Sequence, residues 1–410
     1  MCLAPSCAWA RAKSNQGAVT PPRPIRVAFV SHHPHLRMGG QRSMALLIEH
    51  LDRAVVEPMA ICPRPGELTD HLTALGCPVV HIPLYHIKPR TLPAVWRSSR
   101  RIRAMLRDRA IDIIAPDASR DALTCGLAKL GTPTRMVWFV RLTARHNLDP
   151  IVERLADGMI GVSEATRQRF SAAPRVTARY RTILDGADMR RFRPADDPAA
   201  LRRALDLPVD GFVLLFVGQV KAAKGVLDIV DAMGALAAAH PRPRRPLLLV
   251  IGTPDPPAII GEIARRTRAL DITEDVRVLP QQSDIERWLQ AADVLVSGSH
   301  QDTEGLSRVL FEAMACGAVP VATDIRGNRE ALTPETGVLV PERSPQAIAR
   351  AVSELMAASP DRLAALRAAG LQRARETFDI RRHARRVEAF YLETLGNGYG
   401  LAGASLPMSR

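Results

Sequence analysis

The chain has 410 residues, of which 47% are hydrophobic, enough to build two ordinary domains. No apolar run approaches the roughly 20 residues that a membrane-spanning helix needs, and the 4% aromatic content leaves few platforms on which nucleic-acid bases could stack. The net charge is +14, but residues 1–195 carry 30 Lys and Arg against 15 Asp and Glu, whereas residues 196–410 carry 26 against 27. This asymmetry predicts a boundary near residue 195 and an anionic partner for the first half, either a membrane surface or a phosphorylated acceptor. Nucleic acid is the weakest candidate partner and is not expected.

The two ends of the chain carry no folding pattern. Residues 1–24 lack the continuous apolar core of a signal peptide and are expected to be a disordered tail, and residues 396–410 a flexible one. The six cysteines show no paired metal-ligand spacing; they are Cys2, Cys7, Cys62, Cys77, Cys125 and Cys316. Free thiols in a reducing cytoplasm are therefore expected.

The first half alternates between strand and helix patterns. Strands are expected at residues 25–31, 55–62, 79–83, 111–115, 135–140 and 158–163, and helices at 41–51, 69–75, 91–109, 121–130 and 149–156. This alternation predicts a parallel, doubly wound sheet. The loop after the first strand contains Gly39 and Gly40, and a strand–glycine–helix arrangement can offer backbone N–H groups to a phosphate. A glycine pair alone is equally compatible with a simple turn.

Residues 91–109 form an arginine-rich amphipathic helix with two interpretations. Six apolar residues can share one face: Leu92, Val95, Trp96, Ile102, Met105 and Leu106. Arginines crowd the rest of the surface. In the first interpretation the apolar face packs against the core and the arginines are solvated. In the second, the helix rests on anionic lipid headgroups.

The second half begins with an entry segment at 195–208 and a continuous apolar strand at 212–217. The loop Gly218–Gly225 follows, and its Lys221 and Lys224 precede a helix, which suits a phosphate-binding loop, although lysines in loops are often just solvated. Further strands are expected at 247–251, 276–279 and 293–297, and helices at 284–292, 345–357, 361–377 and 380–395. The last helix is expected to cross back to the first domain.

Residues 300–340 form the most informative stretch. A helix is expected over 306–316, ended by Gly317, then a buried strand at 318–323 and a polar turn at 324–328. Glu304 precedes this helix and Glu312 lies two turns inside it. A helix rises about 1.5 Å per residue, so the two carboxylates could contact both ends of a ligand roughly 10 Å long, such as a sugar nucleotide. The simpler interpretation is two solvated glutamates.

This stretch resembles the Glu-x7-Glu signature of retaining family 4 glycosyltransferases, which have the GT-B fold. The similarity includes EAMACG, the following Pro-Val strand and a Gly-Asn-x-Glu turn that ends at Glu330. It implies an α/β fold with two Rossmann-like domains facing a cleft: an acceptor domain at 25–195, a donor domain at 196–378 and a crossing helix at 379–395.

The resemblance also implies roles for individual residues. Glu304 would contact the donor sugar and Glu312 the ribose hydroxyls, while Gly39 and Gly40 would lie against the diphosphate. Lys224 matches the lysine of the family's phosphate loop, Gln219 replaces its arginine, and Lys221 is the candidate substitute for the missing charge. The remaining donor-binding candidates are Gln282, at the nucleobase, and Gly305, Leu306 and Ser307.

The sequence departs from the family pattern at two further places. Relatives commonly have a histidine at the end of the strand 135–140, where this chain has Arg141, and the nearest histidine is His146. Both are retained as catalytic candidates beside Glu304. In the interdomain link, Asp185 stands where asparagine is common.

The implied activity is metal-independent, retaining transfer of a hexosyl-type unit. The sugar would move from a nucleoside-diphosphate sugar, a co-substrate rather than a cofactor, to a lipopolysaccharide, capsule or similar acceptor in the cytoplasm or on the inner membrane face. The sequence contains no Asp-x-Asp motif of the kind that binds a metal-bound diphosphate. Three alternatives stay open: another enzyme on the same architecture, such as a sugar-nucleotide epimerase or a phosphorylase; a nucleic-acid-binding protein; and a non-catalytic relative bound to a membrane or partner.

Overall fold

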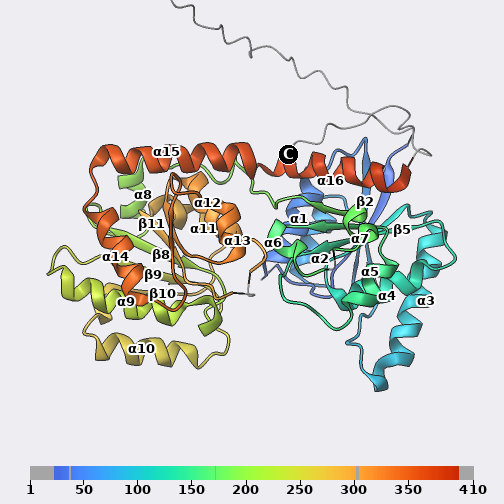
Figure 1. Cartoon of the computed structure of the whole chain (residues 1–410), viewed down its shortest axis with the longest axis horizontal. Helices are drawn as coiled ribbons and strands as arrows, with labels where there is room; N and C mark the ends of the chain where they lie inside the picture. Colours follow the sequence, from blue (N-terminus) through green and yellow to red (C-terminus); the bar gives the residue numbers. More distant parts are fainter. Residues whose placement is uncertain (1–22, 37, 171, 302–303, 397–410) are drawn as a thin grey trace, which may run out of the picture.

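Two parallel β-sheets, one in each half of the chain, organise the structure (Figure 1). The computed structural model describes residues 23–36, 38–170, 172–301 and 304–396. The first sheet has seven strands in the order β3-β2-β1-β4-β5-β6-β7, and the second has six in the order β10-β9-β8-β11-β12-β13. In each sheet the chain winds outward from a central strand in both directions, which is the doubly wound, Rossmann-like topology.

The elements of the first half are as follows. Its strands are β1 (Ile25–Val30), β2 (Val56–Cys62), β3 (Val79–His81), β4 (Ile113–Pro116), β5 (Arg135–Val140), β6 (Gly158–Gly161) and β7 (Tyr180–Thr182). Its helices are α1 (Gly39–His50), α2 (Glu67–Ala74), α3 (Leu92–Asp108), α4 (Ser119–Lys129), α5 (Asp149–Leu155), α6 (Glu164–Arg167) and α7 (Pro174–Arg179).

The second half continues with a second set. Its strands are β8 (Val213–Val217), β9 (Leu247–Ile251), β10 (Val276–Leu279), β11 (Val294–Ser297), β12 (Val319–Thr323) and β13 (Val338–Val340). Its helices are α8 (Pro198–Ala204), α9 (Val226–Ala239), α10 (Ile259–Ala269), α11 (Ile285–Ala291), α12 (Arg308–Cys316), α13 (Arg326–Ala331), α14 (Pro345–Met356), α15 (Pro360–Thr377) and α16 (Ile380–Leu395).

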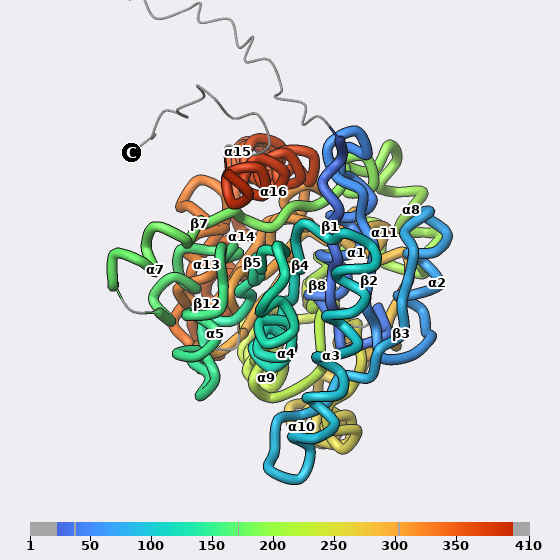
Figure 2. The backbone as a smooth tube through the Cα atoms, turned by 90° about the vertical axis from the view of Figure 1, so that its right-hand side faces the viewer, coloured from blue at the N-terminus to red at the C-terminus, as the bar shows by residue number. Residues whose placement is uncertain are grey.

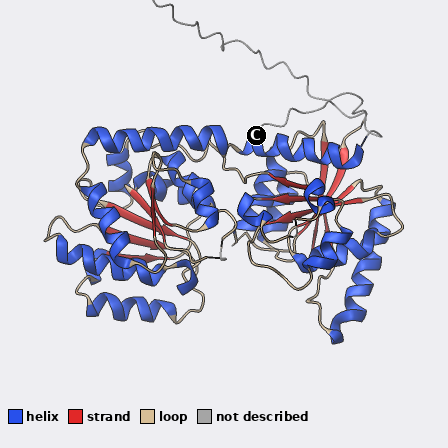
Figure 3. Ribbon diagram, viewed as in Figure 1, coloured by secondary structure: helices blue, strands red, loops and turns tan. Residues whose placement is uncertain are grey.

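Helices cover both faces of each sheet (Figure 3). In β1, Val27 and Phe29 join a core shared with α1 on one face, whereas Ala28 and Val30 join a core shared with α3 and α4 on the other. Successive side chains of a strand point to opposite faces, so an all-apolar strand is buried on both sides, as parallel sheets require.

The two last helices connect the domains along one side of the molecule. α15 lies over the second domain, and α16 continues over the first (Figure 1). In the view turned by 90°, the two helices lie along the same edge of the molecule (Figure 2). Val387, Phe390 and Tyr391 of α16 share the core of β1 and α1. The expected return of the C-terminal helix to the first domain is confirmed.

Most expected elements are present, with four differences. The helix expected from Leu306 begins at Arg308, because Ser307 has the extended backbone of a helix-capping position. The expected polar turn at 324–328 runs into helix α13. The short edge strands β7 and β13 and the helices α7, α8 and α10 were not expected from the sequence. Gly317 ends α12 with a φ of 88°, as expected from its position.

Helix α3 corrects one prediction. Val95, Ile102, Met105 and Leu106 are buried, but Leu92 and Trp96, which were expected on the same face, are 52% and 59% exposed. The buried residues belong to the side of α3 that packs against α4, and Leu92 and Trp96 lie outside that contact.

Other expectations concern the thiols and the ends of the chain. Four cysteines, Cys62, Cys77, Cys125 and Cys316, are buried and unpaired. Cys2, Cys7 and most of the two expected tails lie outside the described residues. In the described part of the chain, no helix combines the length and apolarity needed to cross a bilayer.

Candidate functional site

The candidate site lies where the second sheet changes winding direction. β8 and β11 are neighbours, but the chain proceeds from them to opposite edges of the sheet. In doubly wound sheets this arrangement opens a crevice at the carboxyl ends of the two strands. The described residues that follow them, 218–225, 298–301 and 304–307, include most of the donor-site residues expected from the sequence.

Two glycines bring these loops together. Gly225 has a φ of +68° and precedes α9, and a Cβ atom there would lie 2.0 Å from the carbonyl oxygen of Gly298. Because no side chain fits between them, the two loops pack backbone against backbone. Lys224, at the end of a short 3₁₀ turn (Ala222–Lys224), is thereby placed beside the loop that holds Glu304.

Lys224 and Glu304 form an ion pair. The ammonium of Lys224 donates to Oε1 of Glu304, and the hydroxyl of Ser299 donates to the same oxygen over 3.3 Å. Both side chains are mostly buried, with 16% and 19% exposed. The structure therefore brings together two of the residues that the sequence singled out, 80 positions apart.

Gln219 and Lys221 contact each other instead. Nζ of Lys221 donates to Oε1 of Gln219 over 2.9 Å. Lys221 thus contacts the residue that replaces the arginine of the family pattern. Its ammonium is a second positive charge in the same loop as Lys224. Its role as the substitute stays a prediction.

Glu312 is held by a residue that the sequence analysis missed. Nη2 of Arg308 donates to Oε1 of Glu312 over 2.9 Å, and Nη1 donates to Oγ of Ser43 and to the carbonyl of Gly186, each over 3.0 Å. Arg308 lies one helical turn before Glu312, and this i, i+4 spacing is the signal that could have identified it. Ser43 and Gly186 belong to the first half of the chain, so the contact also joins the domains.

The backbone between Glu304 and α12 is enclosed. A Cβ atom on Gly305 would lie 2.1 Å from the carbonyl oxygen of Arg141, and one on Gly327 would lie 2.4 Å from that of Gly305. Oγ of Ser163 donates to the Gly305 carbonyl over 2.6 Å. Gly305 is thus fixed by the first domain on one side and by α13 on the other, and only glycine fits there. Leu306 and Ser307 follow and are buried.

The start of α1 lies against the same region. A Cβ on Gly39 would approach Cδ of Arg308 to 4.0 Å, and one on Gly40 would approach Cδ of Arg141 to 3.3 Å and Oδ2 of Asp117 to 3.4 Å. The glycine pair, expected in the loop before this helix, instead forms the first two residues of α1, and it lies at the contact between the domains. No described contact joins it to Lys224 or Glu304.

Arg141 is placed among carboxylates. Its Nη1 lies 3.1 Å from Oδ2 of Asp185 and its Nε lies 3.6 Å from Oδ2 of Asp117. Burial raises the pKa of Asp117 despite Arg141. Burial also acts to raise the pKa of Asp185, but Arg141, His383 and Arg308 outweigh it and hold that pKa below its usual range.

Two predicted site residues lie apart from this cluster. His146 is exposed, and its Nδ1 accepts a hydrogen bond from the backbone of Leu148 over 3.1 Å. Among the described residues, no contact brings it to Glu304 or Arg141. Gln282 donates to the carbonyl of Pro280 over 3.0 Å, in the loop after edge strand β10. Their assigned roles stay predictions.

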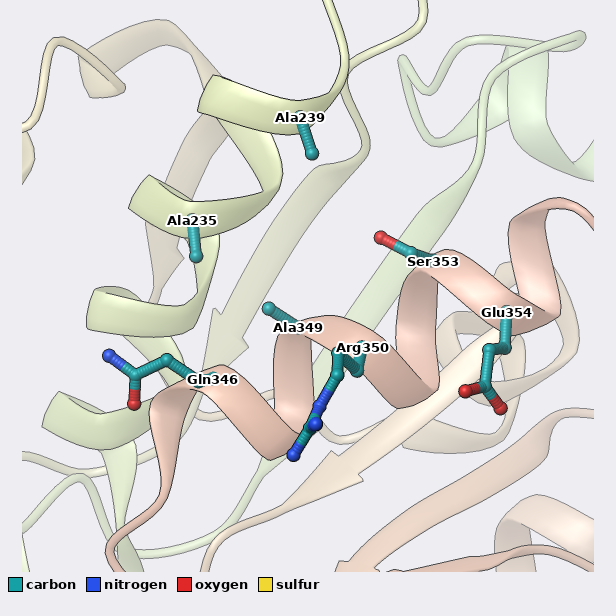
Figure 4. A pocket seen from close by; sticks show the side chains of 7 residues that line it. All are labelled: Ala235, Ala239, Gln346, Ala349, Arg350, Ser353 and Glu354. Atoms are coloured by element: carbon teal, nitrogen blue, oxygen red, sulfur yellow. The ribbon is translucent and has the colours of Figure 1, made fainter.

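A surface hollow elsewhere is separate from this site. It lies between α9 and α14, where Ala235, Ala239, Ala349 and Ser353 face one another and Glu354 lies at the rim (Figure 4). None of the predicted site residues lines it.

Comparison with protein families assigns the second half of the chain. Residues 211–358, which cover most of the second domain, match the model described as "Glycosyl transferases group 1". A D-inositol 3-phosphate glycosyltransferase of Thermobispora bispora is 31% identical over 265 residues, which are 62% of this chain and 59% of the relative. The chain spans about half the length of the curated relatives it matches.

Solved structures extend the similarity to both domains. A glycosyltransferase from Rickettsia africae has a TM-score of 0.79 at 18% identity, covering 91% of this chain and 99% of the other. The Anabaena protein HepE, solved in complex with UDP and glucose, has a TM-score of 0.75 at 16% identity, covering 89% and 98%. The chain has the GT-B fold, as the sequence predicted.

Proposed function

We propose that this protein transfers a sugar from a nucleoside-diphosphate sugar to a hydroxyl group of a cell-envelope glycan or glycolipid. The observation that carries the proposal is the Lys224–Glu304 ion pair, located at the switch point of the domain that matches group 1 glycosyl transferases. A lysine beside a carboxylate suits a nucleoside-diphosphate sugar. The lysine neutralises the diphosphate, and the carboxylate accepts hydrogen bonds from the sugar hydroxyls.

The proposed roles follow from this placement. Lys224 and Lys221 meet the diphosphate, Glu304 holds the reacting sugar, Glu312 accepts the ribose hydroxyls and Gln282 lies near the base. During transfer, the bond from the anomeric carbon to the diphosphate oxygen breaks with its electron pair, and the acceptor oxygen bonds to that carbon and loses its proton. We propose that the anomeric configuration is retained and that the diphosphate charge is met without a metal ion.

The identity of the acceptor has two candidates. The basic first domain suits an anionic acceptor such as a phosphorylated envelope glycan. The name of the Thermobispora relative indicates a phosphorylated cyclitol instead. Both present a hydroxyl near a phosphate, and product analysis with each acceptor would distinguish them.

A membrane surface is the proposed partner of α3. Trp96 is exposed and the guanidinium of Arg100 lies 4.8 Å from its ring, beside the exposed Arg97 and Arg101. An exposed tryptophan flanked by arginines suits the interface of an anionic bilayer. The enzyme would then work at the inner face of the cytoplasmic membrane.

Thermal stabilisation by UDP, GDP, ADP and TDP and their sugars would test the donor site. A ligand that binds the native state at a hundredfold excess over its Kd stabilises it by about 2.7 kcal/mol. We expect one nucleotide series to raise the melting temperature, equally with and without EDTA. If no nucleotide does so, the protein is a non-catalytic relative. Conversion of the donor sugar without any acceptor would instead identify an epimerase.

A further inference from the structure

The first sheet has a switch point of its own, and it carries a histidine–carboxylate pair. β1 and β4 are neighbours, with Val30 opposite Pro116, and the chain leaves them toward opposite edges. His32 follows β1 by two residues, and Asp121 lies in the first turn of α4, directly after β4. The same topological rule that places the donor site in the second domain therefore places a ligand crevice here.

The pair has the geometry of an oriented base. Nδ1 of His32 lies 2.7 Å from Oδ2 of Asp121, whose side chain is 1% exposed, while the His32 side chain is 15% exposed. A buried carboxylate accepts the Nδ1 proton and so fixes the tautomer in which Nε2 carries the lone pair. In the described part of the chain, no residue forms a hydrogen bond with that Nε2.

Charged groups of both signs surround His32. Nε of Arg120 lies 3.8 Å from Oδ1 of Asp121, the carboxylate oxygen that does not contact His32. Burial, together with the charges of His32 and Arg120, lowers the pKa of His33 to about 4, so this neighbouring ring is neutral at pH 7. The titratable and charged groups that surround His32 are His33, His35, His86, Asp117, Arg120 and Asp121.

The His32–Asp121 pair borders the interdomain cluster. Asp117 directly follows β4, lies 3.6 Å from Arg141 and is within electrostatic reach of His32. Arg141 in turn contacts Gly305 through its backbone. Asp117, Arg141 and Gly305 therefore form a series of neighbouring residues between His32 and Glu304.

We propose that His32, oriented by Asp121, accepts the proton of the acceptor hydroxyl. The inference rests on the proposed glycosyl transfer and assigns the group that takes the proton of the acceptor. The Nε2 lone pair takes the proton as the acceptor oxygen bonds to the anomeric carbon, the nucleoside diphosphate leaves with the bonding electrons, and the imidazolium then releases its proton to water. This assignment does not determine whether the anomeric configuration is retained, because the base contacts the acceptor oxygen and not the anomeric carbon.

The test follows nucleoside-diphosphate release from UDP-, GDP-, ADP- and TDP-sugars, with water or methanol as the acceptor. General bases typically contribute 10²–10⁴-fold. We expect His32→Gly to lose at least 100-fold in kcat, to regain turnover with added imidazole, and to lose the acidic limb of the pH profile. Asp121→Asn should lower kcat in the same way. His33→Gln, which replaces the adjacent ring, should retain the wild-type rate.

The outcomes separate the two proposals. If the wild type releases nucleotide and His32→Gly matches it in rate and pH profile, the base assignment is wrong and the transferase proposal stands. A slow His32→Gly that imidazole does not rescue would assign His32 a structural role. Absence of release by the wild type from every donor would overturn both proposals. Melting temperatures of the variants confirm that each one is folded.

Discussion

Arg141 and Asp185 form an ion pair, with 3.1 Å between Nη1 and Oδ2. These are the two first-domain positions at which the sequence departs from the pattern it resembles, since relatives commonly have histidine and asparagine there. An arginine at the end of β5 introduces a buried positive charge, and an aspartate in the interdomain link compensates it. The two departures are therefore in direct contact.

Replacing Asp185 tests this coupling through pH. Because Arg141, His383 and Arg308 hold the pKa of Asp185 below the unfolded value of about 3.9, the native state gains stability above that pH and loses it as the pH falls through the folded pKa. We expect Asp185→Asn to cost up to about 3 kcal/mol at pH 7, since it leaves a buried arginine with one partner fewer. Urea unfolding at pH 7 and pH 3 measures the difference, which should shrink at pH 3.

Asp188→Asn is the matched control, because among the described hydrogen bonds the side chain of Asp188 accepts only a local one, from the backbone N–H of Arg190. Its effect should stay within about 0.5 kcal/mol. A penalty for Asp185→Asn that is equal at both pH values would show that the charge of Asp185 does not matter.

Glu312 should determine donor affinity. Arg308 holds one oxygen of its carboxylate and leaves the other for hydroxyl groups. A hydrogen bond to a charged group contributes about 1.5–3 kcal/mol, so Glu312→Ala should weaken nucleotide binding by roughly 10- to 100-fold in calorimetric titration. Glu354→Ala, which removes an exposed glutamate from α14, should bind like the wild type. Unchanged affinity of Glu312→Ala would remove Glu312 from the donor site.

Glu304 should determine turnover instead. Its carboxylate is positioned by Lys224 and Ser299 and is expected to contact the reacting sugar. Interactions of this kind with the transition state are worth roughly 10²–10³-fold in kcat. We therefore expect Glu304→Ala to lower kcat by at least 100-fold while nucleotide affinity stays within a few-fold of the wild type. Steady-state kinetics with a donor sugar would contradict this if both parameters were unchanged.

The strands and helices that have a clear local pattern of apolar residues were predicted from the sequence. β5, β9, β10 and α16 match their expected ranges because each is a run of apolar or amphipathic residues bounded by clear breaks. The three-residue edge strands β7 and β13 were missed because such short segments carry no period. Helix α10 was also missed, although its buried Ile259, Ile263 and Thr267 have helical spacing.

The candidate site likewise has residues that short motifs identify and contacts that only the structure shows. Lys224, Glu304 and Glu312 were identified from short motifs, and the pairing of the first two follows from the close packing of Gly225 on Gly298. The contacts of Arg308 with Ser43 and of Arg141 with Asp185 join residues 265 and 44 positions apart. No local period encodes such pairs: the first depends on how the two domains meet, and the second on which loops the first sheet brings together.

The exposed face of α3 predicts binding to anionic vesicles. Each arginine near such a surface contributes on the order of 1 kcal/mol, so Arg97→Glu/Arg101→Glu should weaken co-sedimentation with phosphatidylglycerol vesicles by roughly 30-fold or more. Arg265→Glu/Arg268→Glu makes the same charge change on α10 of the second domain and should have little effect. Equal losses in both variants would indicate that net charge alone drives binding, and no loss would exclude α3 as the contact.

A carboxylate of the second domain closes the contact with the first. Glu330 on α13 accepts hydrogen bonds from the backbone N–H groups of Glu164 and Ala165, over 2.7 and 2.6 Å, at the start of α6. Unpaired N–H groups at the first turn of a helix favour a negative charge. This capping of one domain by the other lies next to Ser163, which donates to Gly305 in the loop of Glu304.

Glu330→Ala should therefore loosen the domains without unfolding them. Hydrogen bonds to a charged group are worth about 1.5–3 kcal/mol, which is enough to shift a balance between joined and separated domains. We expect a larger radius of gyration by small-angle X-ray scattering and a lower kcat, because Gly305 and Glu304 lose their support from the first domain. Glu335→Ala, on an exposed loop of the same domain, should leave both unchanged. A Glu330→Ala protein with wild-type dimensions and a lower kcat would instead place Glu330 in the chemistry of the site, since the domains would then remain joined through Arg308 and Ser163.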